Sequence, residues 1–90
     1  MSQAIVDPNE VRRFARNLER MSSELQNQML MLKGQLHNLG ETWRDQEHDK
    51  FVQEFEQTLV ATHRFLEATQ SHVPFLLRKA DKVEEYLRQR

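Results

Sequence analysis

Apolar residues recur at helical spacing along the first half of the chain. From Val11 to Leu39 they follow one another at steps of three or four, which keeps their side chains on one helix face. Asp7 and Pro8 stand directly before this run, and the pair is typical of a helix start because aspartate caps free N–H groups and proline suits the first turn. The pattern therefore predicts a helix over about residues 8–39. The predicted seam consists of Val11, Phe14, Leu18, Met21, Leu25, Met29, Leu32, Leu36 and Leu39.

A second run with the same spacing follows a short break. We expect Gly40 to end the first helix in a left-handed conformation, and Thr42 to cap the next helix after a bend over residues 40–42. The second helix is predicted over about residues 43–88. Pro74 removes one backbone bond within it, so we expect a kink or break near residues 71–74. The predicted seam consists of Phe51, Phe55, Leu59, Leu66, Val73, Leu76, Ala80, Val83 and Leu87, with Thr62 and Thr69 filling two places.

Two helices joined by so short a bend must be antiparallel neighbours. The chain is therefore predicted to be a single all-α domain over residues 1–90, a helical hairpin. A lone hairpin encloses no core, yet apolar residues lie beside both seams, so we predict that it dimerises into a four-helix bundle. A homodimer and a heterodimer with a paralogue both remain open. The predicted dimer interface consists of Leu25, Met29, Leu30, Met31, Leu32, Val52 and Val60.

Composition and charge narrow the possible partners. The 90 residues carry 13 Lys and Arg against 14 Asp and Glu, a net charge of −1, so no overall field attracts nucleic acid. Cysteine is absent, which excludes disulfides and thiolate chemistry. The longest apolar run, residues 29–32, is far too short for stable membrane insertion, and the N-terminus lacks the features of a cleavable signal peptide. We therefore expect the protein in the cytoplasm at synthesis.

No grouping of residues predicts catalysis, a cofactor or a metal. His48, His63 and His72 are too far apart along one helix to share a metal ion. The acids at the start of the second helix are explained by its dipole. Basic clusters at residues 12–20 and 78–90 are interleaved with acids, which argues against a nucleic-acid stripe. We expect both basic clusters to lie on solvated helix faces, and docking to an acidic partner is the alternative. The sequence thus predicts a non-enzymatic interaction protein.

Trp43 is the only tryptophan, and a bend does not need it. It either plugs the open end of the hairpin or docks a partner, since tryptophan is enriched among binding hot spots. Trp43 at the bend, followed by Phe51 and Phe55, resembles the WXG100 (ESAT-6-like) family over roughly residues 5–87. The resemblance implies a small hairpin dimer, exported by a bacterial type VII secretion system through a route that needs no signal peptide. It also implies a secretion ATPase or a larger secreted effector as partner.

Two positions depart from the family pattern. The motif reads Trp43-Arg44-Asp45, with aspartate where the family has glycine, and Arg90 stands four places after Tyr86, where the family's tail signal has an acid. The predicted recognition residues are Trp43, Asp45, Phe51, Phe55 and Tyr86. The departures leave two hypotheses: a secreted substrate or export partner, and an intracellular coiled-coil adaptor or structural subunit with no export role.

Overall fold

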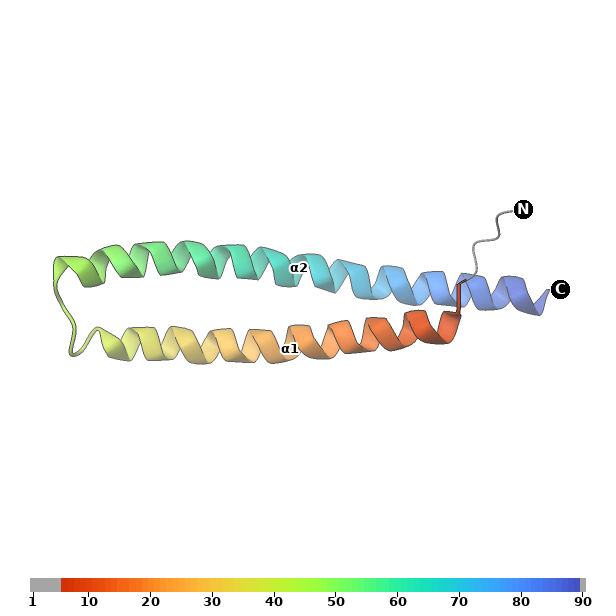
Figure 1. Cartoon of the computed structure of the whole chain (residues 1–90), viewed down its shortest axis with the longest axis horizontal. Helices are drawn as coiled ribbons and strands as arrows, with labels where there is room; N and C mark the ends of the chain where they lie inside the picture. The colour runs from red at the N-terminus through yellow and green to blue at the C-terminus, as the bar shows by residue number, and fades with distance from the viewer. Residues whose placement is uncertain (1–5, 90) are drawn as a thin grey trace.

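The protein is a hairpin of two long helices. The computed structural model describes residues 6–89, in which α1 spans Pro8–Leu39 and α2 spans Gln46–Arg88. The helices run antiparallel, and α2 continues past the beginning of α1 (Figure 1). The molecule measures 68 × 23 × 14 Å, so it is one helix thick in its shortest direction. The predicted all-α antiparallel hairpin is confirmed.

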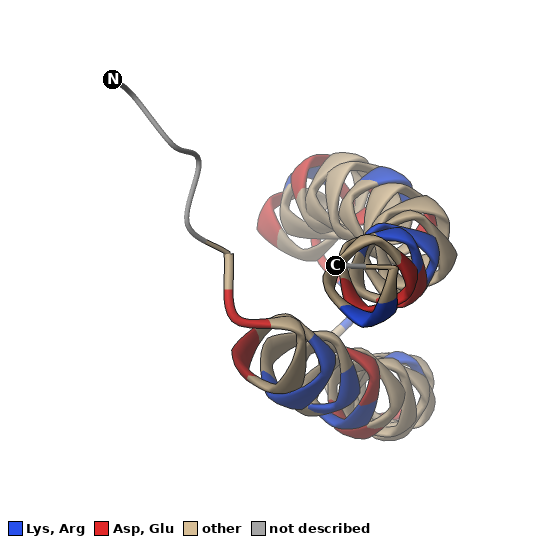
Figure 2. Ribbon diagram, turned by 90° about the vertical axis from the view of Figure 1, so that its right-hand side faces the viewer, with Lys and Arg blue, Asp and Glu red and all other residues tan. Residues whose placement is uncertain are grey.

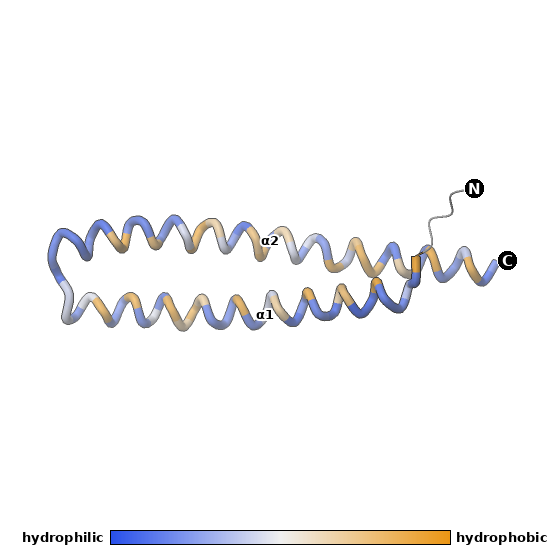
Figure 3. The backbone as a smooth tube through the Cα atoms, viewed as in Figure 1, coloured by the Kyte–Doolittle hydropathy of each residue, from blue (hydrophilic) through white to orange (hydrophobic). Residues whose placement is uncertain are grey.

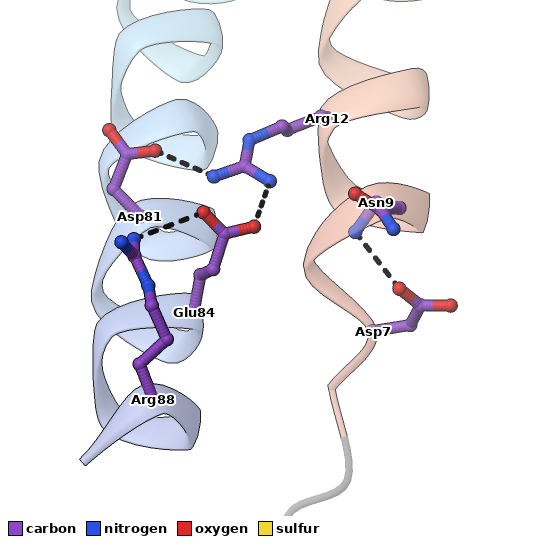
Figure 4. Close-up of polar contacts among 6 residues, drawn as sticks. All are labelled: Asp7, Asn9, Arg12, Asp81, Glu84 and Arg88. Carbon is purple, nitrogen blue, oxygen red and sulfur yellow. Dashed lines mark hydrogen bonds and ion pairs between the residues drawn. The ribbon is translucent and has the colours of Figure 1, made fainter.

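The first helix begins at an aspartate cap and ends at Gly40. The Asp7 carboxylate accepts a hydrogen bond from the Asn9 N–H at 2.9 Å (Figure 4). Gly40 has φ −65° and ψ −13°, which is right-handed, so the expected left-handed conformation is wrong. The chain keeps winding beyond this point, because the N–H groups of Thr42 and Trp43 both donate to the Leu39 carbonyl, at 3.2 and 3.0 Å.

The second helix begins later than predicted, at Gln46 instead of residue 43. Its cap is Asp45, whose carboxylate accepts a hydrogen bond from the His48 N–H at 2.9 Å. Thr42 is not the cap, since its hydroxyl lies 3.4 Å from the Leu39 carbonyl that it donates to. The bend predicted over residues 40–42 is therefore too short. The Trp43 N–H still donates to the Leu39 carbonyl of α1, so α2 can begin only after Trp43.

The predicted break near residues 71–74 does not occur. The second helix runs continuously through Pro74, which is exposed. An internal proline costs roughly 3 kcal/mol of local helix stability. Here the turns on both sides of Pro74 are held against α1 by buried side chains. Thr69 and Val73 lie before the proline, and Ala80 lies after it. Packing of the flanking turns therefore outweighs the local preference for a break.

Small side chains supply most of the buried contact between the helices. The Ser22 and Thr69 hydroxyls are buried and lie 2.8 Å apart. Each also lies 2.8 Å from a carbonyl of its own helix, Ser22 from that of Leu18 and Thr69 from that of Leu66, so both polar groups are satisfied. Among residues 6–89 the buried side chains are Ala15, Ser22, Leu66, Thr69, Val73 and Ala80.

Two large residues of the predicted first seam do not point at α2. Phe14 is 59% exposed and Met21 is 45% exposed, although their neighbours Ala15 and Ser22 are buried. Adjacent residues on a helix point about 100° apart, so the small stripe faces the second helix and the large stripe faces sideways. Apolar positions recur along both helices (Figure 3), and only part of them serve the hairpin's own contact.

An ion-pair cluster ties the start of α1 to the end of α2. The Arg12 guanidinium lies 2.8 Å from the Asp81 carboxylate and 2.9 Å from that of Glu84, which Arg88 also approaches at 3.3 Å (Figure 4). The hydrogen bond and the charge of Arg12 lower the pKa of Glu84. Acidic and basic residues both occur along the two helices (Figure 2).

Candidate functional site

A row of aromatic rings occupies the bend end of the hairpin. The Trp43 ring centroid lies 5.1 Å from that of His48, edge to face, and 5.9 Å from that of Phe51. Phe51 in turn stacks on Phe55 at 5.6 Å. The structure therefore brings together Trp43, Phe51 and Phe55, which the sequence analysis singled out. Such aromatic contacts add about 0.5–1.5 kcal/mol each beyond area burial, so the row fixes the orientation of Trp43.

His48 belongs to this row and was missed as a functional residue, because it was considered only as a metal ligand. Its side chain is 14% exposed, and its Nε2 is buried with no hydrogen-bond partner among the described residues. The signal for it was its spacing, since His48 precedes Phe55 by seven residues and both turn toward α1. A Cβ added at Gly40 would lie 3.5 Å from the His48 ring, an ordinary contact distance, and 3.3 Å from the His37 carbonyl oxygen, so the imidazole lies close to the Gly40 backbone.

Asp45 has a structural role at the third motif position. Its backbone is extended, with φ −108° and ψ −176°, which any residue adopts, and its carboxylate caps α2. Asp45 is exposed, so a partner could still reach it. An aspartate cap contributes about 1 kcal/mol relative to alanine. An aspartate at this position is therefore compatible with the hairpin fold.

An open groove runs between the two helices next to the bend. It has a volume of about 760 Å³ and is bordered by charged and apolar side chains together, including Lys33 and Glu56 beside Leu36, Val52 and Leu59. The groove marks one side of the hairpin. Because sequence neighbours point about 100° apart, Leu32 and Lys33 lie on opposite sides of the contact line, as do Phe51 and Val52.

The opposite side of the hairpin is a broad apolar surface. Since Lys33 and Val52 border the groove, Leu32 and Phe51 lie away from it, together with the residues at helical spacing from them. We call this surface the lateral apolar face. Its residues are 40–59% exposed: Phe14, Met21, Leu32 and Leu39 on α1, and Phe51, Phe65 and Leu87 on α2.

The residues predicted for the dimer interface do not form one surface. Leu32 belongs to the lateral apolar face, and half-buried Leu25 lies beside it at the contact with α2. Met29, Val52 and Val60 border the groove side. Leu30 and Met31 are 60% and 64% exposed and point away from the hairpin contact.

The predicted recognition residues are divided between the two ends of the molecule. Tyr86 is 66% exposed and lies near the end of α2, at the opposite end of the hairpin from Trp43 (Figure 1). One copy of the chain cannot present both to a single small contact surface. The bend and the tail are therefore separate candidate sites.

Two further findings concern metals and membranes. Within residues 6–89 no three metal-binding side chains come together. His63 and Glu67 approach to 3.8 Å as an exposed pair, and two ligands do not make a zinc site. Over the same residues, neither helix has the length and hydropathy of a transmembrane span.

Comparison with known proteins gives a family and a set of similar structures. Residues 3–86 match the family model WXG100, described as proteins of 100 residues with WXG. A comparison with the curated proteins finds no match. The similar solved structures include EsxB of Bacillus anthracis strain Sterne, described as a secreted protein.

Three forms of EsxB illustrate the likeness. A point mutant superposes with a TM-score of 0.82 at 28% identity, covering 94% of this chain and 96% of that one. The selenomethionine-labelled protein gives 0.78 at 28% identity, covering 96% and 98%. The wild-type protein gives 0.76 at 29% identity, covering 91% and 94%. The likeness thus extends over nearly the whole length of both chains.

Proposed function

Since this chain belongs to the WXG100 family, we propose that it is a non-enzymatic substrate or export partner of a type VII secretion system and acts as a dimer of hairpins. The lateral apolar face is the observation that carries this proposal. The similar protein EsxB is described as secreted, which supports export of this chain as well. An intracellular adaptor with the same hairpin is the alternative.

The lateral apolar face supports dimerisation because a second hairpin packed on it would remove its large apolar side chains from water. It carries four aromatic or methionine side chains, Phe14, Met21, Phe51 and Phe65, each 40–59% exposed. Covering the exposed half of such a side chain contributes roughly 1 kcal/mol. The face follows both helices, so a second hairpin laid along it would complete a four-helix bundle. An identical copy or a paralogue with a similar stripe satisfies this requirement.

The bend supports a role in recognition. Trp43 is half-buried, and its ring is held by His48 and Phe51, so the ring is both a plug and a preformed contact. Preformed aromatic contacts lower the entropy that binding costs. We propose that the secretion ATPase or a larger co-exported effector recognises Trp43 together with Asp45, while Phe51 and Phe55 hold the Trp43 ring in position. Tyr86 supplies the second recognition site at the tail.

A matched pair of charge substitutions tests the dimer. Leu32→Asp places a carboxylate on the lateral apolar face, whereas Val60→Asp places one on the groove side, and the two side chains are similarly exposed, at 47% and 52%. We expect Leu32→Asp to halve the mass measured by light scattering and Val60→Asp to leave it unchanged. Equal masses for both variants and the parent would remove the argument for this face.

Export is tested separately in a bacterium with a type VII system. The protein is expressed with and without the membrane ATPase, and culture medium and cells are compared by immunoblot. We expect ATPase-dependent appearance in the medium, and its loss in Trp43→Ala when circular dichroism shows an unchanged helix content. Retention of the parent protein in the cells in both strains would favour the adaptor.

A further inference from the structure

We infer that the tail of α2 carries a docking surface of its own, separate from the lateral apolar face, which fits an acidic groove on a partner protein. The surface consists of Phe75, Arg78, Lys79, Lys82 and Tyr86, and we call it the basic stripe. The inference deepens the proposed function and rests on it in one respect, that the tail is a recognition segment.

The basic stripe lies on the outer side of α2. Its residues are separated by three, one, three and four positions, so they share one helix face. The opposite side of the same turns is buried or half-buried against α1, through Val73, Ala80 and Val83. The stripe is therefore not covered by α1.

Two exposed aromatic rings end the stripe. Phe75 is 58% exposed and Tyr86 is 66% exposed, although the hairpin contact lies on the far side of both. They are eleven residues apart, about 16 Å along a helix. Phenylalanine and tyrosine are enriched in protein interfaces, so a partner accounts for their position better than solvent does.

The cations between these rings are left without ion pairs. Arg78, Lys79 and Lys82 are exposed, and none lies within 4.0 Å of a carboxylate among residues 6–89. Two acids of the same turns, Asp81 and Glu84, instead form ion pairs with Arg12 (Figure 4). These acids therefore do not neutralise Arg78, Lys79 and Lys82, whose face stays positive and is bordered by Glu85, on a chain whose net charge is −1.

The order of residues along the stripe favours a protein over a membrane. A helix that lies in a membrane surface needs a continuous apolar face, with its cations at the edges. Here the cations occupy the middle and the aromatic rings occupy the ends. An acidic groove with an apolar pocket at each end complements this order, and such complementarity gives both orientation and specificity.

Heteronuclear NMR on the full chain tests the inference, with synthetic peptides as probes. Octaglutamate, alone and with a leucine at each end, is titrated at about 20 mM salt, where charge attraction is only weakly screened. We expect chemical-shift changes over residues 75–86 and tighter binding of the leucine-ended peptide. Phe75→Ser with Tyr86→Ser should abolish the difference between the two peptides.

A matched pair of triple variants decides whether the stripe is specific. Arg78→Glu, Lys79→Glu and Lys82→Glu together should weaken peptide binding by at least about tenfold. Arg16→Glu, Lys50→Glu and Arg64→Glu make the same change in net charge at exposed cations elsewhere, and should leave binding within about twofold. Equal losses in both triple variants, or shift changes spread over all exposed cations, would overturn the inference.

Three further outcomes are informative. Tighter binding to phosphatidylserine-containing vesicles than to either peptide would identify a membrane surface and overturn the inference. Concentration-dependent shifts over residues 75–86 without peptide would identify a second copy as the occupant, with the same consequence. A monomeric or non-exported parent protein that still binds the peptides through residues 75–86 would contradict the proposed function and leave the basic stripe standing.

Discussion

The buried hydroxyl pair offers a sharp test of what holds the hairpin together. Thr69→Val keeps the shape of the side chain and removes the oxygen that lies 2.8 Å from the Ser22 hydroxyl. Ser22→Ala removes the other partner. In each single variant the remaining hydroxyl keeps a carbonyl acceptor in its own helix, that of Leu18 or Leu66, so no donor is left unpaired.

The expected magnitudes follow from this geometry. Each single variant loses one inter-helix hydrogen bond and should lower the free energy of unfolding by about 1 kcal/mol. The double variant replaces both hydroxyls by apolar groups and should return close to the parent, because a fully apolar contact has no polar group to desolvate. The coupling energy between Ser22 and Thr69 in the double-mutant cycle is therefore expected to be about 2 kcal/mol in magnitude, because two single losses of about 1 kcal/mol each disappear in the double variant.

Chemical denaturation followed by circular dichroism measures these energies, and thermal melts check them. A loss of about 1 kcal/mol corresponds to roughly 4–8 °C in a domain of this size. All variants are compared at one protein concentration, because association would otherwise change the apparent stability. Thr58→Val is the control, since that exposed hydroxyl lies 3.5 Å from the Glu54 carbonyl and makes no contact across the hairpin. Additive losses in the double variant would refute the reasoning.

Three other substitutions probe separate parts of the molecule. Gly34→Ala should raise the unfolding free energy by about 0.5–1 kcal/mol, because a Cβ there meets nothing within 4 Å and alanine stabilises a helix interior. A fall in stability together with a loss of dimer mass would instead show that another helix packs against Gly34. Arg12→Gln should weaken the dependence of the unfolding free energy on pH in the acid range. Arg12 lowers the pKa of Glu84, so this ion pair stabilises the fold above the ordinary value of 4.5, and the contribution is lost as the pH falls through the lowered pKa. Identical pH profiles of the variant and the parent in denaturant titrations would contradict this. Ala15→Leu should lower the unfolding free energy by about 1–3 kcal/mol in denaturant titrations, because Ala15, like Ala80, is fully buried between the two helices. An unchanged denaturation midpoint would show that the helices can separate there without cost.

Apolar periodicity predicted the hairpin but not which stripe faces inward. On α1 the large stripe that includes Phe14 and Met21 and the small stripe that includes Ala15 and Ser22 both repeat every seven residues. Local spacing is the same for both, so it cannot choose between them. The choice depends on how closely two backbones approach and on what covers the second stripe, and both are tertiary properties.

Local signals at the bend and at Pro74 were outweighed for related reasons. Thr42 and Asp45 are both good caps, and the longer winding of the chain after Leu39 selects Asp45. Pro74 is unfavourable within a helix, and packing of the neighbouring turns keeps the helix intact. At the bend, spacing was enough to single out Trp43 and the phenylalanines, whereas the contact of His48 with Gly40 depends on the three-dimensional path of the turn.

The sparse contact between the helices links the lifetime of this protein to its supply of partner. No large side chain among the described residues is completely enclosed, so a solitary hairpin would open often enough for proteases to cut it. Cells that make the chain in excess over its mate would clear the surplus. Stoichiometry would then be controlled by degradation, without a separate regulator.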